Sequence, residues 1–292
     1  MMAWLGFFYH PFWAVSTALL AAVVRLQMRN RWNPQACAVR LTGKTAIVTG
    51  ANTGIGKFIA LDFARRGARV ILACRSEARG TAALNEIREK TGNLDVHLRL
   101  VDLSSMDSVR AFAERILKEE KALHILVNNA GVSDLMKSSS PSRIVSVSSV
   151  NHKRGNVDFS HFHGKNLSYG MDQVYNNTKL HNIICTNELA RRLKGTDVTA
   201  NSVHPGIVMT EVMRHYSFWV RWIFNLIGFF FFKSPEAGAV STIYCAVAEE
   251  LEGVTGKYVD SDCSLTLPIP LARDAALAVK DFEFCERLTS KL

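Results

Sequence analysis

The sequence lacks the cysteine spacings on which zinc fingers and disulfide frameworks are built. Its 292 residues include six cysteines, but no Cys-x-x-Cys pair and no close cluster of cysteines. We therefore expect a reducing compartment and no metal site. The six are Cys37, Cys74, Cys185, Cys245, Cys263 and Cys285.

The sequence also lacks a basic run interleaved with aromatic residues, although its formal net charge is +9. Nucleic-acid binding is therefore not expected. A scattered basic surface suits an anionic membrane face or a phosphate-bearing cofactor equally well. With 48% hydrophobic and 21% charged residues, the composition is that of an ordered globular chain.

Charged residues are missing from Met2 to Val24, a stretch rich in Trp, Phe, Leu, Val and Ala. As a helix this stretch would span roughly the 30 Å hydrocarbon core of a bilayer. Arg25, Arg29 and Arg31 follow it directly. Positive charge after the apolar run favours an uncleaved anchor over a signal peptide, and it places the rest of the chain in the cytosol.

The apolar run is interrupted by His10 and Pro11, so a helix lying in the membrane interface remains an alternative to a spanning one. We expect residues 1–33 to form the anchor and its basic flank. Residues 41–292 are expected to form one globular domain.

Within this domain, short β-rich runs alternate with helical patterns. Such alternation implies right-handed crossovers and predicts an α/β fold with a parallel, doubly wound sheet. The expected strands are 44–49, 69–74, 96–101, 123–127, 143–147 and 197–203, and the expected helices are 55–66, 77–90, 105–120 and 172–193.

One crossover helix is missing from the pattern. Only residues 129–142, rich in Gly, Ser and Pro, join the strand at 123–127 to the strand at 143–147. Parallel strands are normally covered on both faces, and the crossover usually supplies a helix for that purpose. We therefore expect a bare apolar strip over these two strands.

A glycine-rich turn, Thr49 to Gly56, joins the first strand to the first helix. Glycines at this place let the backbone approach a pyrophosphate, and the helix N-terminus offers free N–H groups. The turn predicts a dinucleotide cofactor. The residues expected to contact it are Gly50, Asn52, Thr53, Gly54, Ile55 and Gly56.

The second strand is followed by Arg75, where a site preferring NAD would carry Asp or Glu for the ribose hydroxyl. An arginine can bind a 2'-phosphate through two parallel hydrogen bonds. NADP is therefore the expected cofactor; a solvated arginine is the alternative.

Tyr175 and Lys179 lie four residues apart on an expected helix, so they share a face. A nearby ammonium favours the phenolate and lowers the pKa of a tyrosine toward a value useful for proton transfer. Ser148 and Ser149 end the fifth strand, at the sheet edge where ligands bind in this architecture.

Together these residues resemble the short-chain dehydrogenase/reductase family over residues 41 to about 262. The family pattern TGxxxGIG is found at 49–56, NNAG at 128–131 and YxxxK at 175–179. The resemblance implies a Rossmann-type fold and makes Ser149, Tyr175 and Lys179 the catalytic residues. It also implies cofactor contacts from Asp102, Asn129, Ala130, Gly131, Tyr175, Lys179, Pro205, Gly206, Val208 and Thr210.

The sequence is most similar to the membrane-anchored retinol dehydrogenase branch of the family, through residues 72–75, 188–193 and 204–206 behind the apolar N-terminus. That resemblance implies NADP(H), a membrane of the endoplasmic reticulum with a cytosolic catalytic domain, and a retinoid or other lipophilic carbonyl as substrate.

The chain departs from the family after residue 131. Family members carry about thirty more residues there, including a helix with a catalytic asparagine that no position here matches. That helix commonly lines the dimer interface, so a homodimer remains open. We expect lower stability and slower turnover than in a version with the segment restored.

Two functional hypotheses follow. The first is reduction of a lipophilic carbonyl by NADPH, with 216–232 as an apolar substrate lid that touches the membrane, or else as an ordinary core helix. The second is a catalytically impaired, membrane-bound member that at most binds cofactor.

Overall fold

The computed structural model describes residues 13, 15–17, 19, 31–127, 134–159, 170–208 and 232–290. The expected anchor over residues 1–33 therefore lies almost entirely outside the described residues. Within the described ranges, no helix is both long enough and apolar enough to cross a bilayer.

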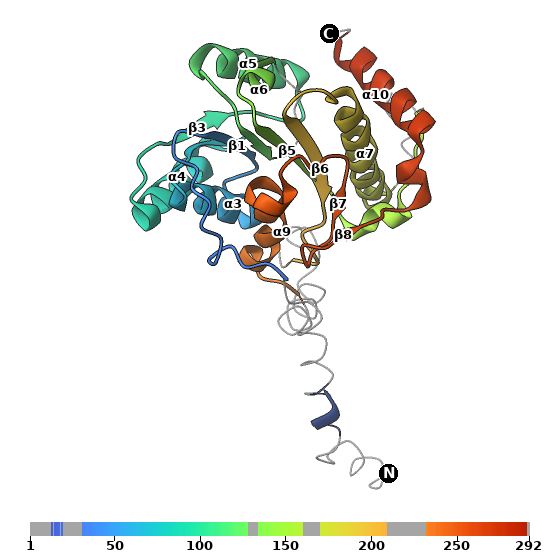
Figure 1. Cartoon of the computed structure of the whole chain (residues 1–292), viewed down its shortest axis with the longest axis horizontal. Coiled ribbons are helices and arrows are strands. Elements are labelled where there is room, and N and C mark those ends of the chain that lie inside the picture. The colour runs from blue at the N-terminus through green and yellow to red at the C-terminus, as the bar shows by residue number, and fades with distance from the viewer. Residues whose placement is uncertain are drawn as a thin grey trace.

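A single eight-stranded sheet forms the centre of the domain, in the order β3-β2-β1-β4-β5-β6-β7-β8 (Figure 1). All neighbours are parallel except β7 and β8, which are antiparallel. The predicted Rossmann-type doubly wound sheet is confirmed, with two short strands added beyond the six expected. The strands are β1 Thr45–Thr49, β2 Arg69–Cys74, β3 Val96–Leu100, β4 Ile125–Val127, β5 Ser142–Val147, β6 Val198–Val203, β7 Tyr258–Val259 and β8 Leu265–Thr266.

Helices cover both faces of the sheet, as parallel strands require. The α-helices are α3 Gly54–Arg65, α4 Glu77–Thr91, α5 Met106–Glu119, α6 Asp134–Ser138, α7 Met171–Arg192, α9 Pro235–Val247 and α10 Ala275–Ser290. Short 3-10 turns are η1 Val150–Arg154, η4 Glu249–Leu251 and η5 Pro270–Arg273.

Alternate residues of the strands divide the core into two layers. Val48 and Val70 pack in one cluster with α3, α4 and α9. Ile47 and Ile71 point to the other face and pack in a cluster with residues of α5, α6 and α7. Because side chains alternate along a strand, each strand supplies both layers.

The segment before β1 packs onto the domain. The Arg66 guanidinium donates hydrogen bonds to the carbonyls of Pro34, Cys37 and Val39, at 2.8 to 3.1 Å. Trp32 packs edge-on against Tyr244 of α9, with ring centroids 5.4 Å apart. Residues 32–39, which follow the expected anchor, are thus held on the domain by Arg66 and Tyr244.

The expected bare strip over β4 and β5 is wrong, because Leu126 and Ile144 are only 5% and 1% exposed. The segment predicted to lack a helix forms the short α6, whose Met136 is fully buried in the same cluster. One and a half turns are enough to place an apolar side chain over the strands.

The rest of the cover comes from α5 and α7, and α10 lies beside α7 (Figure 1). Phe282 packs against the cluster that contains Met136, and Arg192 of α7 lies over its ring, 4.2 Å from the centroid. Arg192 also pairs with Glu286 at 2.9 Å. On α5, Arg110 donates to the carbonyl of Thr289, so α10 is tied to both α7 and α5.

We predict that Met136→Ala lowers the free energy of unfolding by about 2 to 5 kcal/mol, because it leaves a cavity over β4 and β5. Leu117→Ala on α5, where the side chain is 53% exposed, should change it by less than about 0.5 kcal/mol. Denaturant titration followed by circular dichroism measures both. Equal losses would mean that α6 does not cover the sheet.

Candidate active site

The glycine-rich turn has the backbone geometry that a bound pyrophosphate needs. Gly50 and Gly54 have φ of +63° and +55°, which side-chain-bearing residues rarely adopt. A Cβ added at Gly56 would lie 2.5 Å from the Gly50 carbonyl oxygen, so α3 starts in close contact with the turn.

The first turn of α3 is open to an anion. Thr53 is its N-cap residue, but the Thr53 side chain makes no capping hydrogen bond, and the first turn has no acidic residue. The N–H groups at the start of a helix have no partner within the helix, and the helix dipole favours negative charge there. Residues 54–56 can therefore hold a phosphate group.

Arg75 and Asp102 lie at the same edge of the sheet, after β2 and β3. Arg75 is exposed. The Asp102 carboxylate accepts hydrogen bonds from the hydroxyl and amide of Ser104 at 2.7 and 3.0 Å. These bonds, followed by the attraction of Arg75, hold the pKa of Asp102 below its usual value. The hydrogen-bonded Asp102 carboxylate and the exposed Arg75 guanidinium thus lie at the edge of the sheet that carries the glycine-rich turn.

The two serines at the end of β5 have different surroundings. Ser148 is buried, and its hydroxyl donates to the Lys179 carbonyl at 2.7 Å. Ser149 is half-buried and is the N-cap of η1, where its hydroxyl oxygen accepts from the Asn151 amide at 3.2 Å. Only the Ser149 hydroxyl is placed to meet a ligand.

Lys179 and Tyr175 are brought together on α7. The Lys179 ammonium lies 5.3 Å from the centroid of the Tyr175 ring and donates to the Val147 carbonyl at 3.2 Å. Burial lowers the pKa of Lys179. Tyr175 is 44% exposed at the mouth of the site. An ammonium next to a phenol is the arrangement that eases proton transfer from its hydroxyl.

Two buried histidines that the sequence did not single out hold the Ser149 segment. His152 Nδ1 lies 2.7 Å from the Ser149 carbonyl oxygen. His204 Nδ1 accepts from the amides of Val150 and Gly206, at 3.2 and 3.3 Å. Burial lowers the pKa of His204 to about 4, so it stays neutral and keeps its acceptor nitrogen. In the sequence, the signal that could have identified His204 is its position directly after β6 and before Pro205-Gly206.

The segment after His204 continues along the same edge. Pro205 is buried, and Gly206 has a φ of +91°. Val208 forms a parallel bridge with Lys233. Of the remaining predicted contacts, Asn129, Ala130, Gly131 and Thr210 lie outside the described residues, as does the expected lid at 216–232 except for Phe232.

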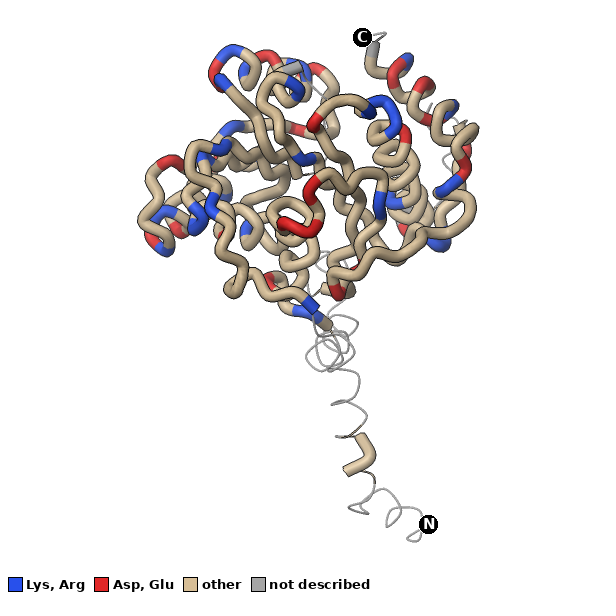
Figure 2. Tube along the Cα trace, in the orientation of Figure 1, with Lys and Arg blue, Asp and Glu red and all other residues tan. Residues whose placement is uncertain are grey.

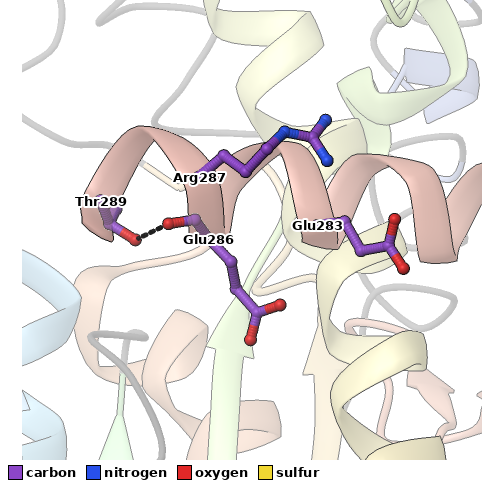
Figure 3. A pocket seen from close by; sticks show the side chains of 4 residues that line it. All are labelled: Glu283, Glu286, Arg287 and Thr289. Atoms are coloured by element: carbon purple, nitrogen blue, oxygen red, sulfur yellow. Dashed lines mark hydrogen bonds between the residues drawn. The ribbon is translucent and has the colours of Figure 1, made fainter. Parts of the chain in front are cut away.

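A separate hollow lies on α10, far along the chain from these residues. Figure 3 shows that Glu283, Glu286, Arg287 and Thr289 line it, with the Thr289 hydroxyl bonded to the Glu286 carbonyl. None of the predicted catalytic residues contributes to it. Because Glu286 pairs with Arg192, this surface holds α10 in place.

Charge is distributed without a single basic face in the view of Figure 2, where Lys and Arg are interspersed with Asp and Glu over the helices. Among the predicted site residues, the charged ones are Arg75, Asp102 and Lys179.

The neutral state of His204 predicts a pH dependence. Its folded-state pKa lies below the unfolded value of 6.5, so stability should fall as pH drops from about 6.5 toward 4. Between pH 7 and 5 the loss should be about 2 kcal/mol. His204→Asn, which keeps an acceptor without a titrating ring, should show a correspondingly flatter profile in thermal unfolding. Parallel pH profiles for the two proteins would contradict this account.

Comparison with known proteins agrees with this geometry. The sequence model of the short chain dehydrogenase family matches residues 44–153. Retinol dehydrogenase 11 of Homo sapiens is 42% identical, with 86% of this chain and 88% of that protein covered. Dehydrogenase/reductase SDR family member 13 of Bos taurus is 38% identical, with 85% and 74% covered. The first alignment runs over 286 positions yet includes only 86% of this chain, so it contains a gap on this side.

Among solved structures, L-sorbose reductase of Gluconobacter frateurii, complexed with NADPH and L-sorbose, has the same fold. It superposes with a TM-score of 0.61 at 22% identity and covers 80% of this chain and 100% of its own. The family's motifs on a shared fold, together with relatives about 40% identical over most of their length, lead to one conclusion: the chain belongs to the short-chain dehydrogenase/reductase family.

Proposed function

We propose that this chain interconverts a lipophilic alcohol with its aldehyde or ketone, using NADP(H). The observation that supports the proposal is that Lys179 contacts both the Tyr175 ring and the end of β5, where Ser149 follows, at the same edge of the sheet as the glycine-rich turn. The retinol dehydrogenases among the relatives favour a retinoid-like substrate.

The residues at this edge fit a nicotinamide dinucleotide. The close contact of Gly56 with Gly50 leaves no room for a side chain at position 56, and the start of α3 offers amides to a pyrophosphate. Arg75 would hold the 2'-phosphate and Asp102 the adenine. Pro205, Gly206 and Val208 would face the nicotinamide end. The cofactor supplies the hydride when bound.

The protein's own part in the reaction is proton transfer and orientation. In the reducing direction, the Tyr175 hydroxyl donates its proton to the carbonyl oxygen that becomes the alcohol. The Lys179 ammonium stabilises the resulting phenolate, and the Ser149 hydroxyl donates a hydrogen bond to the same oxygen. In the oxidising direction, the Tyr175 phenolate accepts the alcohol proton.

A second candidate is a catalytically impaired member that binds cofactor without turnover. The observation that favours it is the short connection between β4 and β5, where α6 has only five residues. The family's catalytic asparagine has no counterpart in that segment. The alignment gap against retinol dehydrogenase 11 also accords with a shortened segment.

We further propose that residues 1–33 attach the protein to the endoplasmic reticulum membrane with the catalytic domain in the cytosol. The uncharged stretch from Met2 to Val24 supports this proposal. We expect the full chain to resist carbonate extraction from membranes and a chain without residues 1–24 to be released. Release of the full chain by carbonate would leave only an interfacial helix.

Cofactor preference tests the role of Arg75. In Arg75→Asp, a charge-assisted contact with the 2'-phosphate becomes a repulsion, so NADPH binding should weaken by well over tenfold and NADH binding much less. Arg65→Asp, at an exposed position on α3, is the matched control for the change in net charge. Fluorescence titration with both cofactors measures the ratio. Equal losses for NADPH and NADH would remove Arg75 from this role.

Turnover separates the two candidate functions. Tyr175→Phe should keep NADPH binding but lose reduction of a lipophilic aldehyde by about 100-fold or more, because only the proton donor is removed. The same assay with the roughly thirty family-typical residues restored after residue 131 should give a faster enzyme. If the natural chain binds NADPH but reduces the aldehyde no faster than Tyr175→Phe, the protein is the catalytically impaired family member of the second candidate function.

A further inference from the structure

Four side chains capable of binding a metal meet between α7 and α10, where the two helices pack against each other. His181 and Cys185 lie one turn apart on α7, and Asp281 and Cys285 lie one turn apart on α10. The Cys185 thiol donates to Asp281 Oδ2 at 3.2 Å, and His181 Nδ1 lies 2.8 Å from Asp281 Oδ1. One ligand atom from each of Cys185, Asp281 and Cys285 lies within 4.8 Å of the others.

The cluster contains a buried carboxylate, which a nearby cation would stabilise. Asp281 has no exposed surface, and a buried carboxylate is costly unless a positive group compensates it. His181 is the nearest candidate, itself largely buried. Neither the hydride transfer nor the proton transfer proposed above uses any of these four residues.

We propose that Cys185, Cys285 and Asp281 bind a zinc ion. His181 is not a ligand in this arrangement but holds the Asp281 carboxylate in place. Two thiolates select zinc over magnesium or calcium, which prefer oxygen ligands. Tetrahedral zinc with bonds of about 2.0 to 2.3 Å puts its ligand atoms about 3.5 Å apart. The present separations need only small side-chain movements to reach that geometry.

The fourth coordination position of the zinc ion is open to a water molecule. Both cysteines are half-buried, so solvent can reach the fourth position. Metal-bound carboxylates are themselves held by hydrogen bonds, and His181 serves Asp281 in this way. The ion would join α10 to α7, the helix that carries Tyr175 and Lys179. It would be a second link between the two helices, besides the Arg192–Glu286 ion pair.

The cysteine spacing predicted no metal site, since 99 residues separate Cys185 from Cys285 in the chain. The site exists only because two helices are packed side by side. This proposal is independent of the proposed reaction, since it concerns the attachment of α10.

The experiment uses the full chain purified in detergent under reducing conditions. We expect about one equivalent of zinc by elemental analysis. Replacement with Co²⁺ should give the thiolate charge-transfer absorption and the intense visible bands of a tetrahedral site. Cys185→Ser and Cys285→Ser should each lose the stoichiometric metal, and His181→Ala should weaken binding about 10- to 100-fold.

Cys37→Ser is the matched control, since Cys37 is also a half-buried free cysteine but lies outside the cluster. It should keep the metal and the cobalt spectrum. A chelator should lower the melting temperature of the natural chain and of Cys37→Ser, but leave that of Cys285→Ser unchanged. The cobalt spectrum of the natural chain is informative even where a variant does not fold.

Two results would overturn the proposal. One is an absence of retained zinc together with a cobalt spectrum typical of water and carboxylate ligands alone. The other is a disulfide between Cys185 and Cys285, found by mass spectrometry of the protein as isolated, because oxidised sulfurs cannot act as the two thiolates.

Discussion

Parallel strands expose an apolar surface on both faces, and the need to cover both is the constraint that shapes this domain. On one face α3, α4 and α9 meet it through ordinary crossovers. On the other face α5 and α7 pack on the sheet, the short crossover between β4 and β5 adds Met136 of α6, and Phe282 of α10 packs against the same cluster. The contacts of Arg192 with Glu286 and with the Phe282 ring therefore hold Phe282 against this cluster.

The same sheet places the chemistry. Because its strands are parallel, their carboxyl ends meet at one edge, and Ser149, Arg75 and the glycine-rich turn all lie there. The position of the Ser149 hydroxyl is fixed by two buried imidazoles, those of His152 and His204, which hold its loop through backbone groups. A hydroxyl that must orient a carbonyl oxygen gains from a loop fixed in this way.

Sequence predicted the first six strands and the helices α3, α4, α5 and α7 to within a few residues, because each is long enough to show a period. It missed α9 and α10, and also β7 and β8, which have two residues each, and α6, which has five. His204 was missed as a positioning residue because its role lies in backbone contacts from two loops. The roles of Ser149, Tyr175 and Lys179 came from family resemblance; residue spacing supplied only their proximity.

The position of α10 in the chain has a consequence for biosynthesis. This helix follows every described strand of the sheet, so the nascent chain can form β1 to β6 before Phe282 has left the ribosome. Until then the cluster around Leu126 and Ile144 lacks part of its cover, and exposed apolar surface is what chaperones recognise and what drives aggregation. The segment that contains Phe282 therefore has to be synthesised before this cluster reaches its full burial.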